Sequence, residues 1–167
     1  GFLTEAVHDA WEPAVDRVLS GEYRLEERMM LRSVHLRNSE EQGAWELLNE
    51  AFIGRGEMAR PVFLKTEIDG HYLTTYVADG VIIATPTGST AYALAAGGPI
   101  LPPELRNILI IPVAPHLSVD RAVVLHEGSW VSVEVHTDHQ ASLSVDGHPP
   151  IPLEDGDQVE VRASEHS

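Results

Sequence analysis

The chain has 167 residues, which is enough to bury the core of one domain, and it contains no cysteine. Disulfides and thiolate metal sites are therefore excluded. Acidic residues outnumber basic ones by 26 to 11, for a formal net charge of −15, which opposes non-specific binding to nucleic acid or to anionic membranes. The sequence has neither a signal-peptide pattern nor an apolar run of about eighteen residues. We therefore expect a cytoplasmic protein with no nucleic-acid or membrane partner.

The first twenty residues favour a helix, with Pro13 in its first turn, an apolar face between Ala14 and Leu19, and Gly21 at its end. The remainder is mostly β in character, and Asp69-Gly70 is a strong two-residue hairpin signal. Strands are expected over residues 30–37, 45–53, 62–68, 72–77, 81–84, 108–113, 122–125, 131–135, 141–145 and 158–162. Many short strands with one or two helices predict a mainly β, β-sandwich-like domain over residues 1–167.

The most informative stretch runs from Asp79 to Tyr92. A turn and a buried strand lead into the hydroxyl-rich loop Thr87–Thr90 and a short helix over residues 91–96, with Ser89 or Thr90 as its N-cap. A strand that delivers hydroxyls and free backbone N–H groups to a helix N-terminus is suited to a polar, often phosphorylated ligand. An ordinary capped connection is the alternative. Gly97 is expected to end the helix in a left-handed conformation.

This stretch, Asp79-Gly80 with Ala84-Thr-Pro-Thr-Gly-Ser-Thr-Ala-Tyr92 and Gly97-Gly-Pro-Ile-Leu101, closely resembles the second half of the NAD kinase family. Further segments resemble the same family: Gly1-Phe-Leu-Thr-Glu5, Leu48-Asn-Glu50, Pro112-Val-Ala-Pro-His116 and Ser144-Val-Asp-Gly-His148. The resemblance thus covers the whole chain. It implies a domain of two packed sheets that binds NAD as substrate.

The family transfers a phosphoryl group to the 2′-hydroxyl of the adenosine ribose of NAD, making NADP. Its first domain carries a Gly-Gly-Asp-Gly-Thr motif that binds the donor and contributes the aspartate thought to act as base, and this chain has no such string. The resemblance therefore implies the NAD-binding half of a kinase, which orients the ribose and holds neither a catalytic residue nor a metal. ATP or polyphosphate and Mg²⁺ are expected only with the missing domain, and the chain alone is expected to be inactive.

The resemblance also implies the substrate-binding residues. The Asn-Glu pair would grip the adenosine end, the loop and short helix would contact the dinucleotide, and a basic residue would meet the pyrophosphate. These residues are Asn49, Glu50, Arg60, Asp79, Thr90, Ala91, Tyr92, Ala95 and His148. Without the resemblance, most of them would be interpreted as solvated surface, and Tyr92 as a core aromatic with a satisfied hydroxyl.

Family members usually form dimers or tetramers in which a neighbouring subunit contributes to the dinucleotide site, so a homodimer or homotetramer is implied. Val77 departs from the pattern, since many members carry an arginine there. Two other functions stay open: a non-catalytic module that binds NAD or NADP or assembles oligomers, and the C-terminal half of a lipid kinase. A Ser-His-Asp triad at His116 lacks nucleophile-elbow context, and the nine histidines lack zinc-site spacing.

Overall fold

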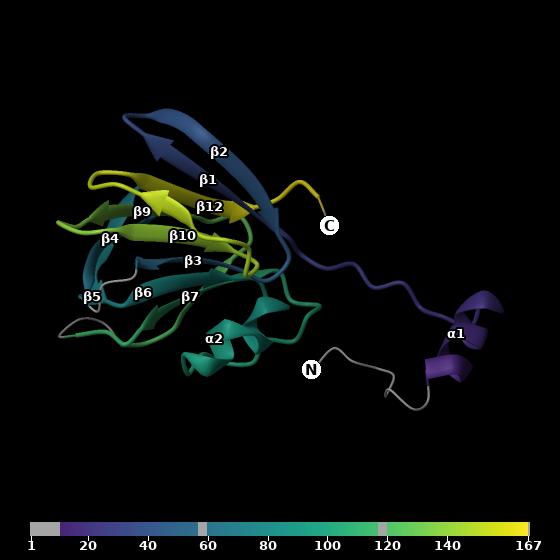
Figure 1. Ribbon diagram of the computed structural model, residues 1–167. Coiled ribbons are helices and arrows are strands. Elements are labelled where there is room, and N and C mark those ends of the chain that lie inside the picture. Colours follow the sequence, from purple (N-terminus) through teal and green to yellow (C-terminus); the bar gives the residue numbers. More distant parts are fainter. Residues whose placement is uncertain (1–10, 57–59, 117–119, 167) are drawn as a thin grey trace.

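The computed structural model describes residues 11–56, 60–116 and 120–166, and within them the chain forms two six-stranded antiparallel sheets. The strand order is β2-β1-β12-β9-β4-β5 in the first sheet and β11-β10-β3-β6-β7-β8 in the second. The sheets pack face to face as a sandwich (Figure 1), which confirms the predicted fold class. The bounds are α1 Trp11–Leu19, β1 Leu31–Arg37, β2 Glu40–Leu47, β3 Glu50–Arg55, β4 Val62–Ile68, β5 His71–Ala78, β6 Gly80–Ala84, η2 Gly88–Thr90, α2 Tyr92–Ala95, β7 Asn107–Val113, β8 Val123–His126, β9 Trp130–His136, β10 Ala141–Val145, β11 Ile151–Leu153 and β12 Gln158–Ala163.

The main core lies between the sheets and follows from the alternation of the strands. Val131, Val133 and Val135 of β9 face inward and are fully buried, as their period-two spacing predicts. The strand β6 differs because it is buried on both faces. Ile83 joins the main core, whereas Ile82 belongs to a smaller apolar cluster on the outer face of the second sheet. The short helix α2 covers that outer face (Figure 1).

The prediction of a single strand over residues 45–53 was wrong. The chain instead leaves the first sheet after Leu47 and enters the second at Glu50, so that β2 and β3 lie in different sheets. The crossing residues are Leu48 and Asn49. The short strand β11 was also not predicted, because Pro150 and Pro152 hide its extended character in the sequence.

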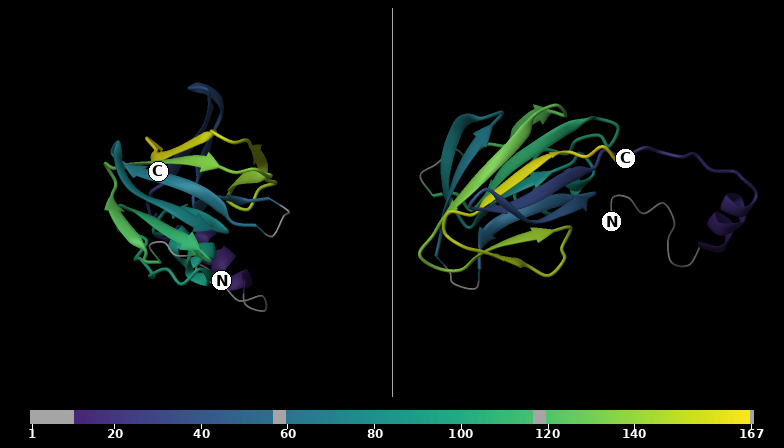
Figure 2. Two further views of the ribbon diagram at one scale, coloured as in Figure 1. Left: turned by 90° about the vertical axis from the view of Figure 1, so that its left-hand side faces the viewer. Right: turned by 90° about the horizontal axis from the view of Figure 1, so that it is seen from above.

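The predicted N-terminal helix is present as α1, and Gly21 follows it with a φ of 81°. None of its residues is buried, and the helix lies apart from the sandwich at the end of an extended segment (Figure 2). In the part of the chain that the structure describes, no helix is long and apolar enough to cross a membrane. The motif segment Gly1–Glu5 lies outside the described residues.

Candidate functional site

The crossing residues Leu48 and Asn49, together with Glu50 at the start of β3, form a tightly bonded turn that we call the Asn49 corner. The carboxylate of Asp146 accepts hydrogen bonds from all three backbone N–H groups of the corner. The N–H of Leu48 donates to Oδ2 at 2.7 Å, and those of Asn49 and Glu50 donate to Oδ1 at 2.8 and 3.0 Å. In return, the N–H of Asp146 donates to the carbonyl of Glu50 at 3.0 Å. One aspartate from the turn after β10 therefore holds the start of β3.

Thr85 holds the same corner from its carbonyl side. Its hydroxyl donates to the Leu48 carbonyl at 2.6 Å and its N–H donates to the Asn49 carbonyl at 2.9 Å. The hydroxyl also accepts the N–H of Gly88 at 3.0 Å. All six backbone N–H and C=O groups of the corner thus have partners, and the loop after β6 is fixed against it.

The same bonding overturns the expected anion cradle. The N–H groups of Gly88, Ser89, Thr90 and Ala91 all donate to acceptors within the loop. The helix α2 has only four residues, and its N-cap is Ala91 without a side-chain cap, so neither Ser89 nor Thr90 caps it. Ser89 Oγ instead donates to the Pro86 carbonyl at 2.6 Å. These four N–H groups are therefore not free for a ligand, and the loop offers its side chains instead. The expected left-handed end at Gly97 is present, with a φ of 86°.

Glu50 and Tyr92 meet across this corner. The backbone N–H of Tyr92 donates to the Glu50 carboxylate, while partial burial and the nearby charge of Asp146 together raise the pKa of Glu50 to about 7. Its Oε2 atom is buried without a hydrogen-bond partner among the described residues. Near neutral pH this side chain is therefore divided between the carboxylic acid and the carboxylate, and it can donate or accept a hydrogen bond.

The ring of Tyr92 is 43% exposed and rests on Phe52, with the two ring centroids 5.6 Å apart and the planes tilted by 57°. Phe52 in turn lies over two glycines, Gly54 of its own strand β3 and Gly80 of the neighbouring strand β6. A Cβ atom on Gly54 or Gly80 would come within 2.4 or 2.3 Å of its ring. The two glycines therefore make room for Phe52 beneath an exposed aromatic surface.

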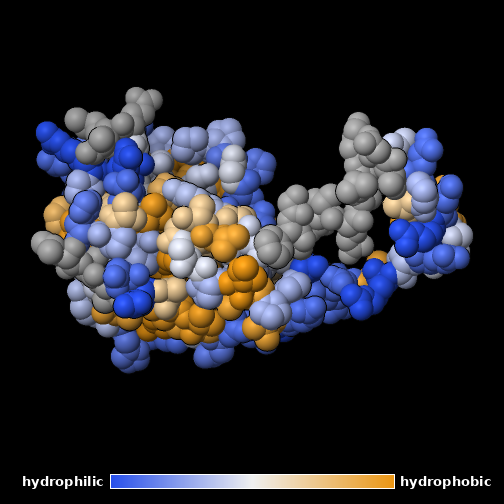
Figure 3. All heavy atoms as spheres, turned by 90° about the horizontal axis from the view of Figure 1, so that it is seen from below, coloured by the Kyte–Doolittle hydropathy of each residue, from blue (hydrophilic) through white to orange (hydrophobic). Residues whose placement is uncertain are grey.

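Beside the loop lies a cavity of about 520 Å³, lined by apolar side chains together with Glu26, Arg28, Thr87, Thr90 and Glu104. The hydroxyl of Thr87 is buried without a hydrogen-bond partner in the described part of the chain. On the face that carries α2, hydrophobic side chains gather in the middle of the sandwich (Figure 3). This face combines apolar surface with a few polar groups, as small-molecule sites do.

Comparison with known proteins identifies the family. Residues 48–167 match the ATP-NAD kinase C-terminal domain. The chain belongs to the NAD kinase family. It is 42% identical to an NAD kinase of Geobacter metallireducens and 44% identical to one of Geobacter sulfurreducens, in each case over 99% of this chain and 59% of the relative. The chain thus spans about three fifths of the length of these relatives.

Two solved structures, of an NADH kinase and of an NAD kinase, have the same fold. Yeast NADH kinase, solved in complex with NADH, has a TM-score of 0.88 at 33% identity, covering 98% of this chain and 48% of that one. An NAD kinase from Archaeoglobus fulgidus, solved in complex with ATP, has a TM-score of 0.79 at 25% identity, covering 99% of this chain and 62% of that one.

The structure brings only some of the residues expected from the NAD kinase motifs together. Asn49 and Glu50 meet the loop that carries Thr90, Ala91 and Tyr92. His148 is exposed and follows the Asp146 turn, with its carbonyl accepting the Ser144 hydroxyl at 3.1 Å. Ala95 is exposed on α2. These residues share one end of the second sheet.

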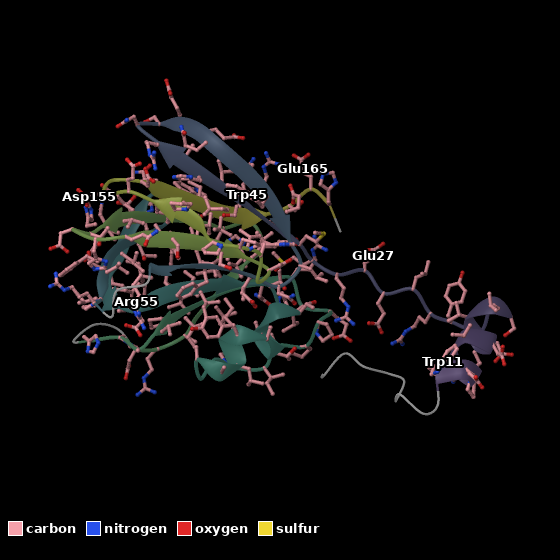
Figure 4. The ribbon with its side chains drawn as sticks, in the orientation of Figure 1. Trp11, Glu27, Trp45, Arg55, Asp155 and Glu165 are labelled. Atoms are coloured by element: carbon pink, nitrogen blue, oxygen red, sulfur yellow. The ribbon has the colours of Figure 1, made fainter. Side chains whose placement is uncertain are left out.

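Asp79 and Arg60 lie elsewhere. Asp79 precedes the five residues of β6 and Thr85 follows them, so about 17 Å of strand separates Asp79 from the corner. Arg55 pairs with Asp79 through Nε and Oδ1 at 3.1 Å, and it lies at the end of the sandwich that points away from α1 (Figure 4). Arg60 is exposed, five residues beyond Arg55 along the chain. Within one chain these two residues are not part of the Asn49 corner.

Three supporting residues were missed by the sequence analysis: Asp146, Thr85 and Phe52. The first two lay inside recognised motifs, but their roles are hydrogen bonds to backbone far away in sequence. For metal binding, no group of three or more His, Cys, Asp or Glu side chains could hold an ion within residues 11–56, 60–116 and 120–166.

Proposed function

We propose that this chain is the NAD-binding half of an NAD kinase, which orients the adenosine ribose so that its 2′-hydroxyl can be phosphorylated to give NADP. The observation that carries this is the direct bonding of the Asn49 corner to the Thr85 loop, because it gathers Asn49, Glu50 and Tyr92 around one surface. The likeness to a yeast NADH kinase solved with NADH supports the same ligand class.

The chemistry of these side chains suits a nucleoside. The Asn49 amide can both donate to and accept from a purine or ribose edge, the Glu50 carboxyl can bond a ribose hydroxyl, and Tyr92 offers a flat apolar wall. Phosphoryl transfer depends mostly on positioning and charge stabilisation. This chain would supply the positioning. ATP or polyphosphate, Mg²⁺ and the base would come from the region of the longer relatives that the chain does not span, so the chain alone is expected to be inactive.

We also propose that a second copy of the chain completes the site, in a homodimer or homotetramer. Asp79 lies a full strand length away from the Asn49 corner of its own chain, so it would meet the dinucleotide bound at a neighbouring copy. Light scattering with and without NAD tests this. A monomer under both conditions would leave Asp79 without a role in binding.

Calorimetric titration with NAD and NADP tests the binding role, with Tyr92→Ala as the weakened variant and Tyr72→Ala as its control. Tyr72 is an exposed tyrosine of β5, in the other sheet. We expect the unmodified chain and Tyr72→Ala to bind equally and Tyr92→Ala to bind more weakly. Absence of binding to either nucleotide would contradict the proposal, and turnover of NAD to NADP by this chain would contradict the division of labour.

A further inference from the structure

We propose that Asp146 is a positioning residue of the dinucleotide site: its carboxylate sets the geometry of the Asn49 corner and thereby the affinity for NAD. The inference rests on the proposed function, because Asn49 and Glu50 are taken as the groups that touch the ligand. Asp146 itself acts through them.

Three backbone donors converge on the Asp146 carboxylate. Three consecutive N–H groups, from Leu48 to Glu50, point at one carboxylate at distances of 2.7–3.0 Å. Hydrogen bonds to a charged acceptor are about twice as strong as those between neutral groups. Where the chain crosses between sheets, no neighbouring strand accepts hydrogen bonds from its N–H groups. For Leu48 and Asn49, the Asp146 carboxylate is the acceptor instead.

Asp146 has a left-handed backbone conformation, with a φ of 47°, and is followed by Gly147 with a φ of 72°. The left-handed region favours Asn, Asp and Gly, so the turn tolerates a few residue types, but of these only aspartate supplies two anionic oxygens. Asparagine keeps the backbone conformation while exchanging one acceptor for an N–H₂ donor. The N–H₂ group of the asparagine would then lie against one of the corner's N–H groups, which is also a donor.

Asp146 also acts on the Glu50 carboxyl through its charge. Asp146 is the charged group that faces Glu50 from the β10 turn, while α2 presents the Tyr92 N–H to the same carboxylate. The negative charge of Asp146 lies close to the Glu50 carboxyl and favours its protonated form. Asp146 therefore influences both the position of Glu50 and the kind of hydrogen bond that Glu50 offers a ribose.

The test compares Asp146→Asn with Asp69→Asn. Asp69 is a close match: it has a φ of 51°, is followed by Gly70, and its carboxylate accepts the Trp130 N–H at 2.9 Å and the Ser129 hydroxyl at 3.1 Å. It serves the β4–β5 hairpin in the other sheet. For each variant we would measure thermal unfolding, amide hydrogen exchange at residues 48–50, and NAD affinity by calorimetry.

We expect Asp146→Asn to speed exchange of the Leu48–Glu50 amides and to weaken NAD binding about tenfold, the equivalent of one lost hydrogen bond to a charged group. Asp69→Asn should bind NAD as the unmodified chain does, even where its unfolding temperature falls equally. Unchanged NAD affinity in a folded Asp146→Asn protein would overturn the proposal, as would an equal loss of affinity in Asp69→Asn.

Thr85→Val gives a second route in case Asp146→Asn does not fold. It removes the hydroxyl that holds the Leu48 carbonyl and leaves Asp146 in place. It should weaken NAD binding as well, and unchanged binding would contradict the role of the corner. If the unmodified chain binds no NAD, the proposed function fails instead, and amide exchange at Leu48–Glu50 alone then decides whether Asp146 positions the corner.

Discussion

A Cβ atom added to Gly88 would lie 2.1 Å from the carbonyl oxygen of Asn49. The neighbouring atoms are backbone atoms, and that carbonyl is already bonded to the Thr85 N–H. The loop and the corner can therefore lie this close together only with glycine at this position. This contact ties the hydroxyl-rich motif of the sequence to the Asn-Glu pair.

Gly88→Ala should accordingly push the loop away from the corner. We expect the free energy of unfolding to fall by about 3 kcal/mol, because the backbone atoms of the loop and of the corner cannot easily move apart. We also expect the remaining folded protein to lose NAD binding. Chemical denaturation and calorimetry measure the two effects. The control is Gly128→Ala, where the nearest atoms belong to the His126 side chain and a change of about 0.5 kcal/mol is expected. Equal losses in both variants would contradict the tight approach.

Glu50→Gln tests the raised pKa. Because the pKa of Glu50 in the folded chain is about 7, above the usual 4.5, its contribution to stability is complete below about pH 4.5 and is lost as the pH rises through 7. With a discount for its partial exposure, the loss is about 1 kcal/mol. Subtracting the unfolding free energies of Glu50→Gln from those of the unmodified chain between pH 5 and 8 should show this slope. A flat difference would mean that Glu50 titrates normally.

Phe52→Ala should remove the support under Tyr92. The ring pair contributes about 0.5–1.5 kcal/mol, so NAD binding should weaken about fivefold if Tyr92 forms a wall of the site. Phe63→Ala is the control, since Phe63 is a 49% exposed residue of β4 in the other sheet. Calorimetry on both variants decides the matter: equal NAD affinities would show that the position of Tyr92 does not depend on Phe52.

Asp157→Asn should separate stability from binding. Burial alone would raise the pKa of Asp157, but hydrogen bonds from Arg37, the Glu154 N–H and His35 hold it at about 2. Removing this buried charge leaves the other partners uncompensated and should cost about 3 kcal/mol of unfolding free energy. NAD affinity should not change, because the cluster ties β12 to β1 in the first sheet. Asp120→Asn, which replaces an exposed carboxylate, is the control. A loss of NAD affinity in Asp157→Asn, together with its loss of stability, would contradict this separation.

Local pattern predicted most of the fold. The alternation at Val131–Val135 located β9, and Asp69-Gly70 located the β4–β5 hairpin, with β5 beginning at His71. The break at Leu48 could not be predicted locally, because the acceptor that replaces the strand ladder, Asp146, lies 98 residues further along the chain.

The site was predicted less completely, for a related reason. Family motifs predicted Asn49, Glu50 and Tyr92 as site residues, and the structure brings these three together, but a motif does not show which N–H groups are already bonded. The N–H groups of Gly88 to Ala91 are bonded within the loop, partly to Thr85, so these four are not free to bind an anion. The strand between Asp79 and the loop was predicted, but the family motifs alone did not show that it keeps Asp79 away from the Asn49 corner of the same chain.

An amide-resolved NMR titration of this chain with NAD tests the central claim most directly. If the Asn49 corner and the Thr85 loop hold the adenosine end, the largest shift changes will fall on Asn49, Glu50 and Tyr92, and adenosine monophosphate will reproduce them while nicotinamide mononucleotide will not. Shift changes confined to other elements, or none at saturating NAD, would contradict the claim.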